Sequence, residues 1–396
     1  MDDLFAIGAD QLFSITANQA AQMTTLSNQA LNNGIEKYVN KDYEGATLDF
    51  KRAFGLDPYS DYAIDAVKYQ AMSHQRLGET EKAIDAYEQG LRVHPYRDDL
   101  HVALGNLYIG EGRTGDAINS YEKAVRYYDD PNNRFSLGQA YLKAGRYDDA
   151  VNQFRKVAKN EQYSRNGYYG LAQVYSAQKK YTKAIEQFEQ AIRKDSQFYD
   201  AYTEMGYAYA DAGEMDKAQE IKSFLENKDS GLASLLNSYI YKATKPKIML
   251  AYADSKFPYF LPPKTEVAAL NSYMANANAS QTFSIRFQFN KEMDRDSVEN
   301  VLNWAITRSQ ESGPGMRYNM GFSVPATEAT ISAIPTGVYY DEKRKTATVR
   351  FDIHQNSDAN ATIDPSHLLF SFRGQDTDGN TMNPDFDQFM GFSKSI

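Results

Sequence analysis

The chain has 396 residues, a formal net charge of −9 and no cysteine. Its length allows two or three domains. Lack of cysteine excludes disulfides, thiolate nucleophiles and cysteine-ligated metal sites. The acidic balance, with scattered basic residues, disfavours nucleic acid or an anionic membrane as a partner.

The first 29 residues are apolar in clusters but match no repeat. A helix over residues 11–31 would place five apolar side chains on one side, and Gly8 is expected to break the pattern before it. Those side chains are Leu12, Ile15, Met23, Leu26 and Ala30. Two functions fit residues 1–29: a cap folded over the first repeat, which we favour, or a docking segment that enters a groove on another copy of the protein.

The beginning of the sequence is acidic and lacks the pattern of a secretory signal peptide. No stretch contains the roughly 20 apolar residues that are needed to span a bilayer. We therefore expect a cell-surface or extracellular protein that is exported without such a signal, with the cytoplasm as the alternative.

Six units of similar length follow in residues 30–228. Each unit has a small residue in its first half and an alanine in its second, and both series step by 37, 34, 33, 34 and 34 residues. In five units an aromatic residue follows one helical turn after the alanine and shares its face. The small residues are Gly34, Ala71, Gly105, Gly138, Ala172 and Gly206; the alanines are Ala46, Ala83, Ala117, Ala150, Ala184 and Ala218; the aromatics are Phe50, Tyr87, Tyr121, Phe154 and Phe188.

This spacing resembles an array of tetratricopeptide repeats over about residues 28–227. The resemblance implies an all-α solenoid of about six helical hairpins, whose first helices line a groove for protein segments. The sixth unit departs from the pattern, because Lys222 and Leu225 replace the aromatic and the small residue. The groove residues expected from the register are Met72, Val102, Asn106, Ile109, Phe135, Gln139, Leu142, Tyr169, Gln173 and Tyr207.

The expected groove lining is aromatic, aliphatic and amide. Chaperone-binding members of the resembled family hold a peptide carboxylate with a set of lysine, asparagine and arginine. Here the only basic residue in that register is Lys68, with Met72 one turn later. We therefore expect an apolar helix or an extended segment with aromatic anchors in the groove, and no capture of a carboxyl terminus.

Residues 229–246 are expected to form a capping helix, over 229–243, and a linker. Residues 247–396 then lose helical periodicity and show short alternating strands, which indicate a β-sandwich. Strands are predicted at 282–289, 338–340, 346–353, 368–372 and 389–392, and Trp304 is expected in the core. The stretches 287–298 and 376–382 resemble the bacterial Ig-like domains of surface-layer proteins, with an insertion at 310–325; that resemblance implies a spacer or adhesive module.

Chemical motifs are few. The glycines of 110–115 match G-x-G-x-x-G, but they follow a predicted helix, so we interpret them as a repeat turn and expect no cofactor. Asp376, Asp378 and Asn380 are either calcium ligands or, as we favour, an ordinary β-turn. The five histidines show no metal-binding spacing.

The sequence thus predicts a non-enzymatic scaffold for protein–protein interaction, without a cofactor or a bound metal. The partner is a segment of another protein or of a neighbouring copy, and self-assembly into a surface array or filament is one form of this. The alternative is a cytoplasmic adaptor or chaperone-like subunit for an exported protein.

Overall fold

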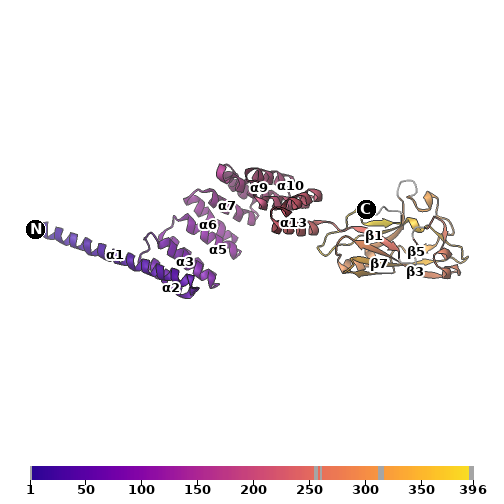
Figure 1. Cartoon of the computed structure of the whole chain (residues 1–396), viewed down its shortest axis with the longest axis horizontal. Coiled ribbons are helices and arrows are strands. Elements are labelled where there is room, and N and C mark those ends of the chain that lie inside the picture. The colour runs from indigo at the N-terminus through magenta and orange to yellow at the C-terminus, as the bar shows by residue number, and fades with distance from the viewer. Residues whose placement is uncertain (1, 254–256, 259–260, 311–315, 392–396) are drawn as a thin grey trace. The chain divides into compact units, whose positions relative to one another are not determined.

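The computed structural model describes residues 2–253, 257–258, 261–310 and 316–391, with side chains from Gln19 onward. The chain divides into two compact units, residues 1–234 and 235–396. The first unit is helical and the second is rich in strands (Figure 1). Within the described ranges, no helix combines the length and the apolar character that crossing a membrane requires.

The helical unit consists of antiparallel hairpins in sequence order, and each helix from α1 to α11 packs against the next. Helix α13 spans the division between the two units. The bounds are α1 Asp2–Val39, α2 Tyr43–Leu56, α3 Ala63–Arg76, α4 Thr80–Val93, α5 Asp98–Gly110, α6 Thr114–Tyr127, α7 Pro131–Lys143, α8 Tyr147–Ala158, α9 Ser164–Ala177, α10 Tyr181–Lys194, α11 Tyr199–Asp211, α12 Met215–Glu226 and α13 Ser230–Ala243. A 3-10 turn at Glu161–Tyr163 precedes α9. The odd-numbered helices from α1 to α11 are the first helices of the six predicted hairpins.

The repeated residues pack as the pattern predicts. A Cβ atom added to Gly105 would lie 2.7 Å from the ring of Tyr121, and one added to Gly138 would lie 2.7 Å from Phe154. The small residue of each of these first helices therefore leaves room for the aromatic ring of the second helix. The alanine of every second helix is fully buried. Close helix contact thus explains why these two positions recur in the sequence.

Helix α1 is longer than predicted. It runs without a break through Gly8 and across the predicted boundary between residues 29 and 30. Its carboxyl-terminal half pairs with α2, where Thr24 donates to Asp57 and Ser27 donates to the carbonyl of Ala53. In Figure 1 the amino-terminal half of α1 extends past α2. The predicted division of the chain into residues 1–29, 30–228, 229–246 and 247–396 stays a prediction.

The second unit contains three sheets. A five-stranded sheet has the order β1-β3-β7-β5, with β6 also paired to β7; β10-β9-β4 and β2-β8 form the other two. The bounds are β1 Ile248–Ala253, β2 Thr265–Glu266, β3 Ser280–Phe289, α14 Arg295–Glu299, β4 Trp304–Arg308, β5 Thr330–Ile331, β6 Gly337–Asp341, β7 Thr346–His354, β8 Thr362–Ile363, β9 Leu368–Phe372 and β10 Gln388–Met390. Short 3-10 turns lie at Val267–Ala269, Ser272–Ala275, Val301–Asn303, Tyr318–Gly321 and Pro365–His367.

Alternation along β3 and β7 builds one apolar core between the sheets. Phe287 of β3 contacts Trp304 at 5.3 Å and Phe370 at 5.5 Å between ring centroids. Trp304 is buried as predicted, and its indole N–H donates to the carbonyl of Val298 at 2.8 Å. A β-rich region therefore follows the solenoid. Part of the insertion expected at 310–325 and the end of the last predicted strand lie outside the described residues.

Candidate functional site

All ten predicted groove residues lie on the first helices of their hairpins, α3 to α11. None of them is buried: Met72 and Asn106 are exposed, and the other eight are half-buried. Their helical neighbours Leu104, Leu137 and Leu171 are buried instead. The register therefore separates a solvent-facing stripe from the core side of each helix.

One pocket brings five of the ten together. It lies between α5 and α7, has a volume of about 360 Å³ and is called the α5–α7 pocket below. The five residues are Asn106, Ile109, Phe135, Gln139 and Leu142, and the same pocket also contacts Tyr121, Ser136, Ala140 and Lys143. An aromatic ring and two aliphatic side chains give it an apolar wall, and two amides and an ammonium group give it polar groups at the rim.

Hydrogen bonds orient the amides of this surface. The Tyr121 hydroxyl donates to Asn106 Oδ1 at 2.6 Å, and Gln139 Nε2 donates to Gln173 Oε1 at 2.7 Å on the next first helix. Burial raises the pKa of Tyr121 to about 12, so the hydroxyl stays a donor at neutral pH. Asn106 keeps its amide N–H groups for a bound backbone or side chain.

The groove residues towards the end of the array have an acidic neighbour that sequence reasoning missed. Glu204 of α11 lies three residues before Tyr207. Burial, and then the charge of Asp200, raises the pKa of Glu204 above its ordinary value. Burial and nearby acids also raise the pKa of Tyr169. Its position in the sequence could have identified Glu204, because residues three apart are neighbours on a helix surface and Glu204 lies three residues before Tyr207.

The structure also explains why a carboxylate clamp is not expected. Lys68 Nζ lies 2.6 Å from Asp99 Oδ2, and Arg97 donates to the same carboxylate. Burial by itself raises the pKa of Asp99, but the hydrogen bonds from Arg97 and Lys68 outweigh it and hold this pKa far below its usual range. The ammonium group of Lys68 is therefore already paired.

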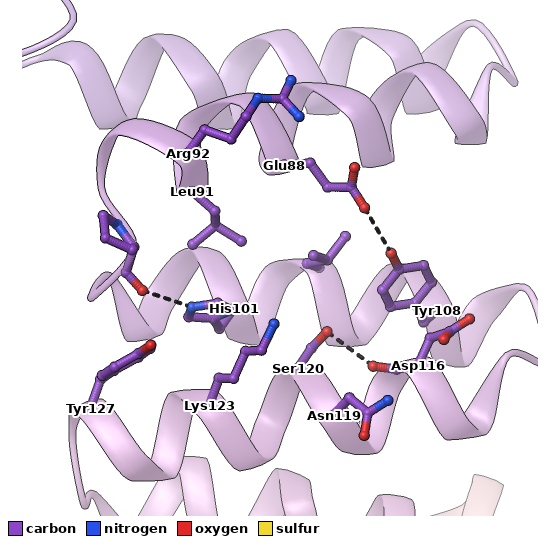
Figure 2. A pocket seen from close by; sticks show the side chains of 12 residues that line it. Glu88, Leu91, Arg92, His101, Tyr108, Asp116, Asn119, Ser120, Lys123 and Tyr127 are labelled. Atoms are coloured by element: carbon purple, nitrogen blue, oxygen red, sulfur yellow. Dashed lines mark hydrogen bonds between the residues drawn. The ribbon is translucent and has the colours of Figure 1, made fainter.

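A second pocket, of about 460 Å³, lies on the side of the second helices between α4 and α6 (Figure 2). Several of its polar groups form hydrogen bonds with one another. Tyr108 donates to Glu88 at 3.3 Å, and the His101 ring N–H donates to the carbonyl of Pro95 at 3.0 Å. Burial, and then Lys123, lowers the pKa of His101. Mixed charges and internal pairing make this pocket a weaker candidate than the α5–α7 pocket.

The remaining sequence motifs are structural. Gly110 ends α5, Gly112 has a φ of 72° in the turn, and Gly115 lies in α6, so the glycine motif is a repeat turn. Asp376 Oδ1 accepts from the backbone N–H groups of Asp378 and Asn380 at 2.9 and 2.8 Å. These contacts define the turn that was favoured over a calcium site.

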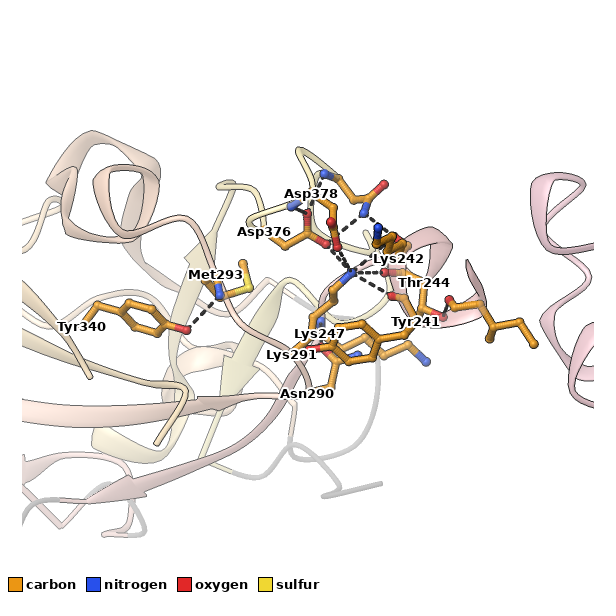
Figure 3. Close-up of polar contacts among 12 residues, drawn as sticks. Tyr241, Lys242, Thr244, Lys247, Asn290, Lys291, Met293, Tyr340, Asp376 and Asp378 are labelled. Atoms are coloured by element: carbon orange, nitrogen blue, oxygen red, sulfur yellow. Dashed lines mark hydrogen bonds and ion pairs between the residues drawn. The ribbon is translucent and has the colours of Figure 1, made fainter. Parts of the chain in front are cut away.

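A buried lysine fills the position that a cation would take beside this turn (Figure 3). Lys291 Nζ lies 2.6 Å from Asp376 Oδ2 and 3.4 Å from Asp378, and both the Lys291 and the Asp376 side chains are at most 1% exposed. The ammonium also donates to the carbonyls of Tyr241, at 2.9 Å, and Thr244, at 3.1 Å, at the end of α13. Lys291 thus joins the last turn of α13 to the strands that follow it.

Family comparisons agree with the repeat geometry. Residues 102–166, 135–197 and 169–229 match the family described as Tetratricopeptide repeat, and residues 19–131 match the Bacterial transcriptional activator domain. No curated protein matches the chain. Residues 102–229 therefore match the tetratricopeptide repeat family, in agreement with the spacing.

Several solved structures are similar to the chain. A tetratricopeptide repeat protein from Parabacteroides merdae is 17% identical with a TM-score of 0.48, over 55% of this chain and 87% of that one. MamA is 28% identical with a TM-score of 0.36, over 41% and 96%. PilF of Pseudomonas aeruginosa is 16% identical with a TM-score of 0.42, over 55% and 99%. The repeat assignment depends on the family matches, because these TM-scores are all below 0.5.

Proposed function

We propose that the tetratricopeptide repeats make this chain a scaffold that binds an apolar or aromatic segment of another protein in the α5–α7 pocket. The observation that carries the proposal is the convergence of Ile109, Phe135 and Leu142 with the amides of Asn106 and Gln139 around one pocket. Apolar anchors provide affinity when they fill such a pocket, and amides fix the direction of a bound backbone. No catalysis is expected of this surface.

Peptides selected from a random displayed library against the full chain test this proposal. The variant Phe135→Ala/Leu142→Ala should weaken the binding of selected peptides about tenfold or more, because it removes both anchoring walls. The matched control is Val39→Ala/Leu48→Ala, two aliphatic side chains that are 72% and 70% exposed on α1 and α2. Equal affinity of the two variants would refute the pocket as the binding site, provided that circular dichroism shows both to be folded.

Self-association through α1 is a second candidate function. Met23 and Leu26 belong to the predicted apolar stripe of α1, yet their side chains are 46% and 42% exposed. Both lie before Ser27, the first buried residue among the described side chains of α1. An apolar helix of this kind fits a groove on a neighbouring copy, and a head-to-tail contact would extend into a filament or a surface array. The cytoplasmic adaptor is the alternative, with a monomer or dimer holding a foreign segment.

Light scattering across a concentration series separates these alternatives. The variant should lack residues 2–18 and also carry Met23→Ser and Leu26→Ser, while it keeps Thr24 and Ser27, which hold the rest of α1 against α2. Self-assembly predicts large species that form with the intact chain and disappear in the deletion variant. Monomers at all concentrations in both proteins would contradict self-assembly and favour the adaptor.

For the β-rich region we propose the role of a spacer or second contact with an Ig-like arrangement. Its buried aromatic core and the Lys291 link to α13 support a rigid module. A fragment of residues 235–396 should then unfold cooperatively; an unfolded fragment would contradict an independent module.

A further inference from the structure

A second surface of the helical unit has a chemistry unlike that of the α5–α7 pocket. It consists of the connections between successive hairpins, residues 57–65, 94–99 and 127–134, and is called the tyrosine edge. Connections from a second helix to the next first helix all lie at the same edge of a hairpin stack. Five tyrosines with exposed side chains occur here: Tyr59, Tyr62, Tyr96, Tyr127 and Tyr128, exposed by 77, 53, 75, 38 and 60%.

Contacts between the connections join these rings into a continuous surface. The ring of Tyr59 lies 5.8 Å from that of His94, whose ring N–H donates to the carbonyl of Pro58 at 2.6 Å. The ring of Tyr96 lies 5.1 Å from that of Tyr127. Each connection therefore supports a ring of its neighbour, and the exposed faces are held in place before any partner binds.

The tyrosine edge is strongly acidic. Its three segments contain seven aspartates and two arginines, with no lysine. Both arginines are already paired, Arg97 with Asp99 and Arg134 with Asp129. Five aspartates form no ion pair with any residue that the structure describes; they are Asp57, Asp61, Asp65, Asp98 and Asp130.

We propose that the tyrosine edge docks a lysine- or arginine-bearing segment of a partner protein. Guanidinium and ammonium groups are attracted to the faces of tyrosine rings and pair with carboxylates beside them. An acidic partner would meet unpaired like charges at this edge, and an uncharged apolar segment would leave them unused. This second contact is independent of the α5–α7 pocket, which has no such acidic cluster.

Fluorescence anisotropy with the full chain and a labelled octa-arginine peptide tests the proposal. Each exposed ring should contribute about two- to fivefold in affinity. The variant Tyr59→Ala/Tyr96→Ala is therefore expected to weaken binding about fourfold or more. Tyr59→Phe/Tyr96→Phe keeps both rings and should bind as the natural chain does. The matched control is Tyr273→Ala/Tyr339→Ala, which removes two tyrosines that are 57% and 62% exposed in the β-rich unit.

Three results would overturn the proposal: no binding of octa-arginine, equal binding of an octa-glutamate peptide, or the same loss in the control as in the edge variant. The pocket variant Phe135→Ala/Leu142→Ala should leave octa-arginine affinity unchanged. That arm distinguishes failure of the tyrosine edge from failure of the α5–α7 pocket.

Discussion

Gly105→Ala is the substitution that tests the packing of the repeats most sharply. In the middle of a helix, alanine is normally more stable than glycine by about 1 kcal/mol. Here the added Cβ would lie 2.7 and 2.8 Å from two carbons of the Tyr121 ring. Tyr121 is 3% exposed and its hydroxyl holds Asn106, so the ring has little room to withdraw. Overpacking of this kind costs about 1–3 kcal/mol.

The two effects together predict a net loss of about 1 kcal/mol for Gly105→Ala. For a helical unit of this size that loss lowers the melting temperature by about 2–4 °C. The matched control is Gly55→Ala in α2, where an added Cβ meets nothing within 4 Å. Because Gly55 lies in the last turn of α2, this control should gain at most about 0.5–1 kcal/mol, the gain expected in mid-helix.

Urea denaturation followed by far-ultraviolet circular dichroism measures both variants, because helices dominate that signal. The opposite signs of the two substitutions are the expected result. If Gly105→Ala were as stable as the natural chain or more so, close packing of glycine on the aromatic ring would not be the reason for the repeat pattern. Displacement of Tyr121 should also disturb Asn106 and weaken peptide binding at the α5–α7 pocket.

Three further substitutions probe the charged and polar core. Lys291→Met leaves Asp376 buried without a counter-ion and should cost about 3–5 kcal/mol in urea denaturation. Lys291→Met/Asp376→Asn should recover most of it, because asparagine removes the buried charge and keeps an oxygen that accepts from the backbone N–H groups of the turn. Burial by itself raises the pKa of Asp376, but the hydrogen bonds from Lys291 and Asn380 and the charge of Lys291 together outweigh it and lower this pKa. The stabilisation from the natural pair should therefore be present above about pH 4 and be lost as the pH falls through the lowered value. Burial raises the pKa of Glu204, so the charged form of this carboxylate disfavours the folded state. Glu204→Gln should therefore stabilise the chain at neutral pH but not below about pH 4, where the carboxyl is protonated. An equal effect at both pH values would contradict this. Tyr340→Phe removes the hydroxyl that accepts from the buried N–H of Met293 at 2.8 Å and should cost about 1–3 kcal/mol; an unchanged urea midpoint would show that N–H to be satisfied otherwise.

The helical half of the fold could be predicted closely because its constraint is periodic. Gly34, Gly105 and Gly138 each face an aromatic ring on the paired helix, so a packing requirement repeats at a fixed interval in the sequence. The position of a residue in the repeat then also predicts which side chains of the first helices face the groove. The extent of α1 escaped prediction, because a single glycine such as Gly8 weakens a helix without ending it.

The β-rich half was predicted in part. Strands β3, β6, β7 and β9 were found, because their inward residues are large and apolar, and the strand predicted at 389–392 overlaps β10. Strand β1 was missed, since its run Ile248–Ala253 follows prolines and shows no alternation. The buried Lys291 was missed for another reason. Its partner Asp376 is far away in the sequence, and one buried ion pair leaves no periodic signal.

The candidate site was likewise predicted only where the repeat pattern is regular. Five residues of the α5–α7 pocket could be predicted from their position in the repeat, because each lies on a first helix. Tyr121 was predicted as a packing residue, but its hydrogen bond to Asn106 depends on contact between two helices. The tyrosine edge was missed because its residues lie in connections, where the repeat pattern is weakest.

The most direct test of the account is where a bound peptide lies. A photo-reactive benzoylphenylalanine in place of Gln139, within the α5–α7 pocket, should cross-link a library-selected peptide efficiently. The same group in place of Leu48, an exposed residue of α2 outside this pocket, should not. Cross-linking at Leu48 but not at Gln139 would contradict the central claim that the first helices of the repeats hold the partner segment.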